Sequence, residues 1–182
     1  MAKRKGKNSH YEAAFEKILR DSGIPYIAIN EFKRPIISGK PIKNFDFIVF
    51  SKKCKYIIDI KGKSFFRKIK RKFVSSKWKN WILEDDWKGL KQWQKTFGKN
   101  FKSIIVYPYW LKNKEDIKQF HDIYYFKNKR YGIVGIYSTD FLKNRKRRSK
   151  KWNTFYIPKE KFKKFVKPIK YFIPEIKLNK RI

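Results

Sequence analysis

Two neighbouring stretches decide the fold: Asn44-Phe-Asp-Phe-Ile-Val-Phe50 and, five residues later, Tyr56-Ile-Ile-Asp-Ile-Lys61. Both are rich in β-branched and aromatic residues, which favour strands. The short polar segment between them suits a turn, so the sequence predicts two consecutive strands. Side chains alternate faces along a strand, and Asp59 and Lys61 therefore share one face. If the two strands pair, Asp46 meets Asp59 at one end of the sheet.

Hydrophobic periodicity predicts helices and strands on both sides of this pair. Apolar residues spaced by three and four predict a helix over Tyr11–Asp21, ended by Gly23, and another from Glu84 or Asp85 to Phe97. Further strands are expected at 26–30, 101–107, 131–137 and 154–157, and helical segments at 114–124, after 138 and at 158–165. Residues 31–43 suit a loop or irregular hairpin, and 63–83 fit no element clearly. We expect an α/β protein with a central mixed β-sheet flanked by helices.

The chain length is that of one domain, at 182 residues. The sequence has no internal repeat and no clean linker. We therefore expect a single domain over 1–182, with a flexible basic N-terminus at 1–8, a core from about 9 to 137 and a basic C-terminal extension at 138–182.

The charge is strongly basic. There are 49 Lys and Arg against 15 Asp and Glu, for a formal net charge of +34. Hydrophobic residues make up 41%, which argues against a disordered chain. A field of this sign attracts polyanions, and nucleic acid, DNA first, is the expected partner. An anionic membrane surface, or the codon bias of an AT-rich genome, would explain the same composition.

Cysteine and histidine exclude several kinds of site. One cysteine, Cys54, rules out an internal disulfide and a cysteine-based zinc site, and His10 and His121 are too scattered for a histidine-based one. No apolar run reaches the length of a membrane span. We expect a cytoplasmic protein that does not enter a membrane.

The acidic residues inside the two strands are the candidates for chemistry. Two carboxylates that converge repel each other unless a cation joins them, and oxygen ligands favour Mg²⁺ or Mn²⁺. A lysine beside them can orient a water and stabilise charge on an attacked phosphate. Glu12 in the first helix could add a third carboxylate. The structural alternatives are an ion pair of Asp59 with Lys61, and a capping box of Ser9 with Glu12.

Asp46 followed by Asp59-Ile60-Lys61 after a β-turn-β unit resembles the PD-(D/E)xK nuclease superfamily. Over residues 9–107 the order of elements is similar too, and the spacing looks most like Holliday-junction resolvases and other restriction-endonuclease-like members. Glu12 matches the acid on their first helix, and Gly23 the glycine that closes it. Two features depart from the pattern: Phe45 stands where the naming proline is expected, and Glu16, one turn on, competes with Glu12.

The resemblance implies a restriction-endonuclease-like core and a metal-dependent endonuclease that hydrolyses DNA phosphodiester bonds. It makes Asp46 and Asp59 ligands of Mg²⁺ or Mn²⁺, with Glu12 as a further ligand or water-orienting group. Lys61 becomes the catalytic lysine. A resolvase-like role would favour a symmetric homodimer.

Basic residues border the expected site on both sides and are candidate phosphate contacts. They are Lys33, Arg34 and Lys43 before Asp46, and Lys63, Arg67 and Lys68 after Lys61. Trp78 and Trp81 lie among them, where packing on the sheet competes with stacking on bases. Gln92 and Gln94 occupy the later helix, where some members of the superfamily place a glutamine near the site; a solvated helix face is the alternative.

Two other functions fit the same sequence. One is a non-catalytic DNA- or RNA-binding module on a nuclease-like fold, because a fold alone does not establish function. The other is a ribosome-associated or structural RNA-binding protein, which would be indifferent to Asp46→Asn. The sequence leaves the substrate's shape open, as well as the choice between DNA and RNA.

Overall fold

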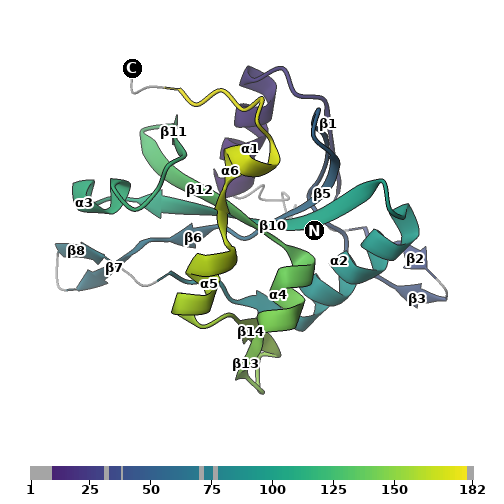
Figure 1. Ribbon diagram of the computed structural model, residues 1–182. Coiled ribbons are helices and arrows are strands. Elements are labelled where there is room, and N and C mark those ends of the chain that lie inside the picture. Colours follow the sequence, from purple (N-terminus) through teal and green to yellow (C-terminus); the bar gives the residue numbers. More distant parts are fainter. Residues whose placement is uncertain (1–9, 31–32, 38, 70–71, 76–77, 180–182) are drawn as a thin grey trace, which may run out of the picture.

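The computed structural model describes residues 10–30, 33–37, 39–69, 72–75 and 78–179 (Figure 1). The segment 1–8, expected to be flexible, and Ser9 of the expected capping box lie outside these residues.

Six helices and fifteen strands occupy the described residues. The helices are α1 (His10–Asp21), α2 (Glu84–Phe97), α3 (Lys114–Ile117), α4 (Ser138–Asn144), α5 (Lys159–Phe165) and α6 (Ile169–Phe172). The strands up to α2 are β1 (Tyr26–Ala28), β2 (Ile36–Ile37), β3 (Lys40–Pro41), β4 (Phe47–Phe50), β5 (Lys55–Ile60), β6 (Lys63–Ser64), β7 (Phe66–Ile69), β8 (Lys72–Ser75) and β9 (Ile82–Leu83). Those after α2 are β10 (Phe101–Leu111), β11 (Ile123–Phe126), β12 (Lys129–Tyr137), β13 (Lys146–Ser149), β14 (Thr154–Tyr156) and β15 (Lys167–Pro168).

A curled mixed sheet forms the centre, in the order β1-β4-β5-β10-β12-β11, with β6 joined to β10 and β15 to β12. β4 and β5 are antiparallel neighbours, so the two predicted strands at 44–50 and 56–61 do pair. β5 and β10 run parallel, and β10 pairs with β12 in the antiparallel sense. This confirms the expected mixed α/β architecture at the level of a sheet flanked by helices.

Helices cover both faces of the sheet (Figure 1). Tyr56, Ile58 and Ile60 of β5 pack with α1 and α6 on one face, while Ile57 packs with α2, α4 and α5 on the other. The strict alternation follows from the two-residue period of a strand. Asp59, two residues after Ile57, therefore lies on the face that α2 covers.

The helix α1 begins at His10, one residue before the expected Tyr11, and ends at the expected Asp21. Its stripe of Ala14, Phe15, Ile18 and Leu19 is fully buried. Gly23 has φ +66°, the left-handed conformation in which a residue without Cβ is least strained, and it closes the helix.

The structure extends or completes several other expectations. β10 runs four residues beyond the expected 101–107, and 31–43 contains the short β2–β3 hairpin. The unassigned 63–83 holds four strands, of which β7 and β8 form a hairpin. Residues 138–179, expected as an extension, contribute β14, which pairs with β9, β15, which joins the central sheet, and buried side chains of α4, α5 and α6.

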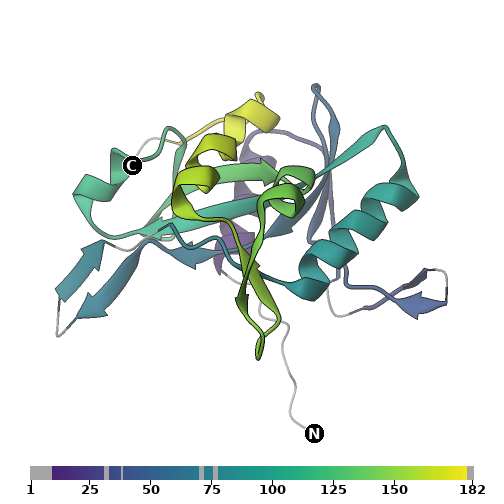
Figure 2. The same ribbon diagram turned by 60° about the horizontal axis from the view of Figure 1, so that its bottom comes forward.

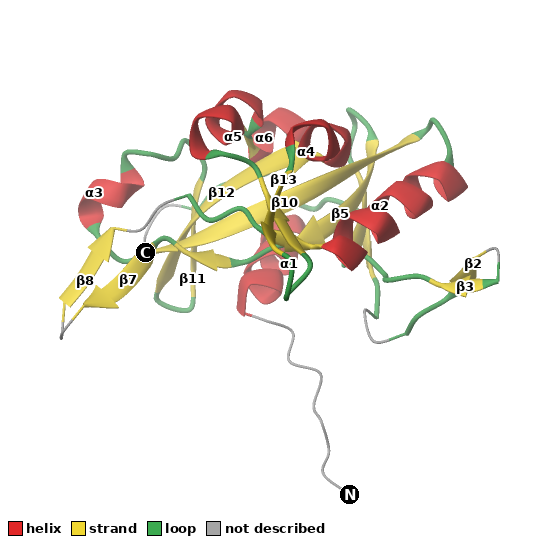
Figure 3. Cartoon of the chain, turned by 90° about the horizontal axis from the view of Figure 1, so that it is seen from below, coloured by secondary structure: helices red, strands yellow, loops and turns green. Residues whose placement is uncertain are grey.

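Three hairpins project from the central body. The β2–β3 and β7–β8 hairpins lie at opposite ends of the molecule, and β13–β14 projects between them (Figures 2 and 3). Across the described residues, no helix combines the length and apolar character that crossing a membrane requires.

Candidate functional site

Asp46 and Asp59 lie at adjacent ends of β4 and β5. The register places Phe47 opposite Ile58, so Asp46, one residue before β4, reaches the end of β5 that carries Asp59. The Ile60 N–H donates to Asp46 Oδ2 at 2.5 Å, and the Asp46 N–H donates to the Ile58 carbonyl at 2.9 Å. The carboxylate of Asp46 is thereby tied to the strand that carries Asp59. The sequence predicted that Asp46 and Asp59 converge if the two strands pair. The strands do pair, and the two residues do converge.

Both carboxyl groups are withdrawn from water. Asp46 is 8% exposed and Asp59 2%. Burial raises the pKa of Asp46, and the neighbouring charges of Asp59 and Glu12 raise it further, against the opposing effect of Lys61. Burial also raises the pKa of Asp59, opposed by Lys61. The pair therefore resists carrying two negative charges unless further positive charge is supplied.

Lys61 is the cation at the centre of the site. Its Nζ lies 2.7 Å from Asp59 Oδ2 and 3.3 Å from Asp86 Oδ1. Burial opposes its charge, but the carboxylates of Asp59, Asp86 and Asp46 raise the pKa of Lys61 above its usual value. Its N–H donates to the Val106 carbonyl at 2.8 Å, which holds the backbone in the sheet. Lys61 is a positioned, permanently charged ammonium.

Asp86 is a site residue that the sequence reasoning missed. It is 4% exposed in the first turn of α2, where Oδ2 accepts the Leu83 N–H at 2.8 Å. Burial opposes its ionisation, yet the charges of Lys61 and Lys43 hold the pKa of Asp86 below its ordinary value. The available signal was Glu84-Asp85-Asp86, three consecutive acids in a chain with only 15, at a helix end that favours negative charge.

Lys43 joins the site through the same carboxylate. Its Nζ forms an ion pair with Asp86. Helix α2 holds the Lys43 backbone closely: Trp93 Nε1 donates to the Lys43 carbonyl at 3.1 Å, and a Cβ at Gly89 would stand 2.6 Å from that oxygen. We call Asp46, Asp59, Asp86, Lys43 and Lys61 the Asp–Lys cluster.

The two candidate acids of α1 have different surroundings. Glu16 Oε1 accepts from Tyr26 Oη at 2.8 Å and from Arg20 at 3.1 Å. Glu12 is near enough to Asp46 to raise its pKa. Glu12, rather than Glu16, is therefore among the groups whose charge acts on Asp46. Tyr11, the residue before Glu12, lies so close to Gly62 that a Cβ on Gly62 would stand 2.1 Å from the Tyr11 ring.

The predicted phosphate contacts fall on two sides of the Asp–Lys cluster. Lys33 and Arg34 are exposed, and Arg34 lies 3.9 Å from Asp85. Lys43 is committed to Asp86, while Lys63 follows two residues after Lys61. Arg67 and Lys68 lie in β7, and their side chains are outside what the structure describes.

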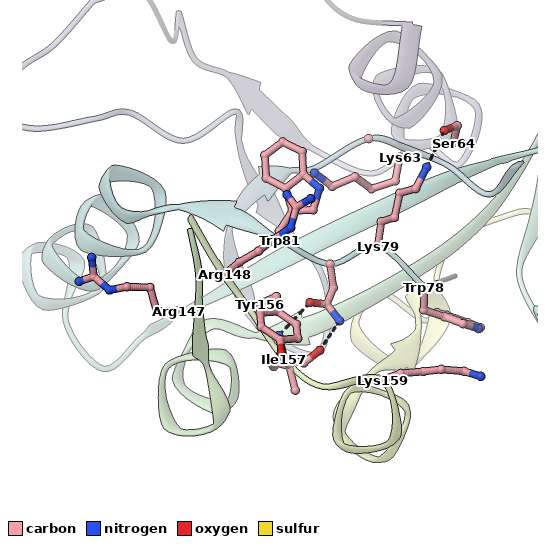
Figure 4. Close-up of a pocket in the computed structure, with 12 residues that line it drawn as sticks. Lys63, Ser64, Trp78, Lys79, Trp81, Arg147, Arg148, Tyr156, Ile157 and Lys159 are labelled. Atoms are coloured by element: carbon pink, nitrogen blue, oxygen red, sulfur yellow. Dashed lines mark hydrogen bonds between the residues drawn. The ribbon is translucent and has the colours of Figure 1, made fainter. Parts of the chain in front are cut away.

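Two hollows adjoin the cluster. One, of about 440 Å³, contains Lys43 and lies between the β2–β3 hairpin and α2; its cations are Arg34, Lys40, Lys43, Lys88 and Lys95. The other, of about 780 Å³, contains Lys63 and is shown in Figure 4. We call them the Lys43 pocket and the Lys63 pocket. The cluster is thus bordered by basic surface on both sides.

The two glutamines of α2 differ in role. Gln94 Oε1 accepts the Ser103 N–H at 2.6 Å, and Nε2 donates to the Gly98 carbonyl at 3.2 Å, so Gln94 fastens the end of α2 to the start of β10. Gln92 lines the Lys43 pocket. Neither is part of the Asp–Lys cluster.

The donor set suits a hard divalent cation in part. Asp46 and Asp59 offer buried carboxylate oxygens whose mutual repulsion a cation would relieve. Within the described ranges, however, no three Asp, Glu, His or Cys side chains are arranged as a complete metal site. The Lys61 ammonium already neutralises Asp59, and the Ile60 amide engages Asp46. A cation held here would take two carboxylates from these residues and would need water or phosphate oxygens to complete its shell.

No protein-family model, no curated protein and no solved structure matches this chain.

Proposed function

We propose that this chain is a metal-dependent endonuclease with a restriction-endonuclease-like core, which hydrolyses phosphodiester bonds of DNA. The observation that supports it is the convergence of Asp46, Asp59 and Lys61 at neighbouring strand ends. Buried carboxylates with raised pKa values beside a fixed ammonium are typical of catalytic sites. We further propose a cytoplasmic location and, from the resemblance to resolvases, a symmetric homodimer.

In this proposal Asp46 and Asp59 hold Mg²⁺ or Mn²⁺, with Glu12 as a further ligand or as the group that orients water. When bound, such a cation polarises a phosphoryl oxygen and offsets the charge that develops on it. The raised pKa values of the two carboxyl groups reflect a local excess of negative charge, which metal binding would relieve.

The side chains themselves account for binding and orientation. Lys61 Nζ, fixed between Asp59 and Asp86, presents positive charge to the attacked phosphate. Water adds to phosphorus, the bond to one ester oxygen breaks, and that oxygen leaves with a proton. Lys33, Arg34 and Lys43 on one side, and Lys63, Arg67 and Lys68 on the other, hold the neighbouring phosphates.

A second function is favoured by one specific observation. Lys61 and Lys43 are both paired with buried aspartates, which makes the Asp–Lys cluster an ion-pair network that can serve the fold alone. A non-catalytic DNA- or RNA-binding protein on the same core would keep this network for stability. It would bind nucleic acid without cutting it.

Nicking of supercoiled and branched DNA with Mg²⁺ or Mn²⁺ separates the two functions. Asp59→Asn should lower the rate by at least about a hundredfold while DNA binding survives, because charge stabilisation and metal binding are lost but the basic surface remains. Asp140→Asn, in the first turn of α4, removes an acid that takes part in none of the ion pairs above and should cut normally. Equal cutting in EDTA would contradict the metal dependence, and no cutting of any DNA would leave only the binding function.

The two acids of α1 provide a matched pair in the same assay. Glu12→Gln should slow cutting because Glu12 borders Asp46, and Glu16→Gln should not, because Glu16 contacts Tyr26 and Arg20 instead. A larger effect of Glu16→Gln would assign the helix acid to Glu16.

A further inference from the structure

The Lys63 pocket is built by three separate parts of the chain. Gly62–Ser64 forms one side, Trp78–Trp81 a second, and the β13–β14 hairpin with the residues that follow it a third. The hairpin lies in the segment beyond residue 137, outside the region that resembles a nuclease. The C-terminal part of this chain therefore completes the pocket with its third wall.

The walls of the pocket are held rigidly. Asn80 is 3% exposed; its Nδ2 donates to the Ile157 carbonyl at 2.9 Å, and its Oδ1 accepts the Ile157 N–H at 2.8 Å (Figure 4). Tyr107 Oη donates to the Asn80 carbonyl at 2.9 Å and Tyr109 Oη to the Lys79 carbonyl at 2.8 Å. These bonds join two walls to each other and to β10, so the pocket is formed before any ligand enters.

Among the described residues that line this pocket, five are cations and none is an acid. The cations are Lys63, Lys79, Arg147, Arg148 and Lys159. Burial lowers the pKa of Lys63 to about 7, and the neighbouring charge of Lys61 adds to the effect. An anion would relieve this concentration of positive charge, and a phosphate is the anion for which lysine and arginine together are best suited.

Aromatic surface accompanies the cations. Lys63 Nζ lies 3.5 Å from the centre of the Trp81 ring, and Arg148 Cζ lies 5.2 Å from it. Figure 4 shows these three side chains pointing toward one another, with the half-buried Tyr156 also lining the pocket. Phosphate-binding cations beside aromatic rings are the combination that recognises single-stranded nucleic acid.

We propose that the Lys63 pocket binds one unpaired nucleotide of a nucleic-acid strand, with its phosphate on Lys63, Lys79 and Arg148 and its base against Trp81 and Tyr156. The placement beside a scissile phosphate rests on the proposed nuclease function; the binding itself does not. The substrate is then a strand with an unpaired segment, as at a branch, flap or frayed end.

The volume of the Lys63 pocket and its position next to the Asp–Lys cluster favour one unpaired nucleotide of a strand as its occupant. A cavity of about 780 Å³ lies within the range of small-ligand pockets, so it admits one nucleotide and not a double helix. Lys63 is two residues from Lys61, so a strand that crosses the Asp–Lys cluster passes directly into the pocket. Continuity with the cluster favours a strand over a free nucleotide.

The test compares a labelled oligothymidylate with a blunt duplex of equal length, by fluorescence anisotropy in EDTA. The unchanged protein should prefer the single strand. Arg148→Gln should weaken single-strand binding by about tenfold, the loss of one charge-assisted contact, and leave duplex binding nearly unchanged. Arg148 is exposed, so this variant should fold normally. Lys63→Gln should also weaken single-strand binding. An unchanged melting temperature of each variant shows that the loss of binding does not come from unfolding.

Lys150→Gln is the matched control. It removes the same charge from the β13–β14 turn, does not line the pocket, and should weaken both probes slightly and equally. Equal affinity for the two probes, or equal effects of Arg148→Gln and Lys150→Gln, would overturn the proposal. So would inorganic phosphate or a mononucleotide that binds as tightly as the oligonucleotide, because the occupant would then be a free anion.

The same assay keeps this proposal separate from the nuclease function. Asp59→Asn should retain the strand preference, since no metal is present. A protein that prefers single strands but cuts no DNA contradicts the nuclease proposal and supports the pocket. A protein that cuts DNA without any strand preference contradicts the pocket alone.

Discussion

At the residue scale, the buried carboxyl group of Asp46 lowers the stability of the folded protein at high pH. Asp46 is 8% exposed, accepts the Ile60 N–H, and lies near the charges of Asp59 and Glu12. Burial raises the pKa of Asp46, so the folded state holds a proton that the unfolded state has already released. Its stabilising contribution is present below the ordinary pKa of an aspartate and lost as the pH rises through the folded value.

Asp46→Asn should therefore stabilise the protein at alkaline pH. The amide oxygen can still accept from Ile60 N–H, and the neutral side chain removes the repulsion with Asp59. We expect a gain of about 1–3 kcal/mol in the free energy of unfolding at pH 8.5, shrinking toward pH 4.5. Urea unfolding in EDTA at the two pH values measures it.

Asp140→Asn is the control for a general charge effect and should show no such pH dependence. A loss of stability in Asp46→Asn at pH 8.5 that exceeds its loss at pH 4.5 would contradict the assigned direction of the pKa shift.

At the scale of elements, the contact between α1 and the loop after β5 positions Glu12. The Tyr11 ring occupies the space that a Cβ on Gly62 would need. Gly62 follows Lys61 directly and Tyr11 precedes Glu12, so this one contact links the segment that carries Lys61 to the helix that carries Glu12. Position 62 requires glycine because the Tyr11 ring lies so close to it, and not because the backbone there has an unusual angle.

Gly62→Ala should consequently destabilise the fold and slow DNA cutting. The added methyl group forces Tyr11 or the loop to move, at a cost of about 1–3 kcal/mol. Tyr11→Ala opens the space, so Gly62→Ala should cost much less in that background. A double-mutant cycle of unfolding free energies measures the coupling; additive costs would show that the two residues do not share this contact.

The elements also differ in how far their sequences reveal them. α1 and α2 have a clear helical period, and each lies where that period predicts it. In the sequence, the hairpins β7–β8 and β13–β14 are basic and show no clear apolar alternation with a period of two, so 63–83 and 143–151 read as irregular. β15 and α6 are only two and four residues long, too short for any periodic signal.

At the scale of the whole molecule, the Asp–Lys cluster gathers three of the 15 acidic residues in a chain whose formal net charge is +34. The Lys43 and Lys63 pockets border the Asp–Lys cluster, and the three hairpins extend outward from the same body (Figure 2). A strand bound across the cluster would therefore contact cations on both sides.

Binding should depend steeply on salt. If about six phosphates are neutralised, affinity for DNA should fall about a thousandfold between about 50 and 200 mM salt. Arg148→Gln should lower the slope for a single strand by about 0.7, the value for one lost phosphate contact. Anisotropy titrations over a salt series measure both. An affinity that does not change with salt would exclude binding through phosphates.

The local pattern of the sequence determined the two helices, the paired strands β4 and β5, and the shared face of Asp59 and Lys61, because each depends on spacing along a few residues. Lys43 was expected beside the site as a phosphate contact, but its ion pair with Asp86 was not foreseen. Asp86 comes from a helix well beyond the two strands in the chain, and only the packing of α2 on the sheet brings it to Lys61 and Lys43. The Lys63 pocket likewise exists only where three distant segments meet. Tertiary structure decided these features because contacts between distant residues leave no periodic trace in the sequence.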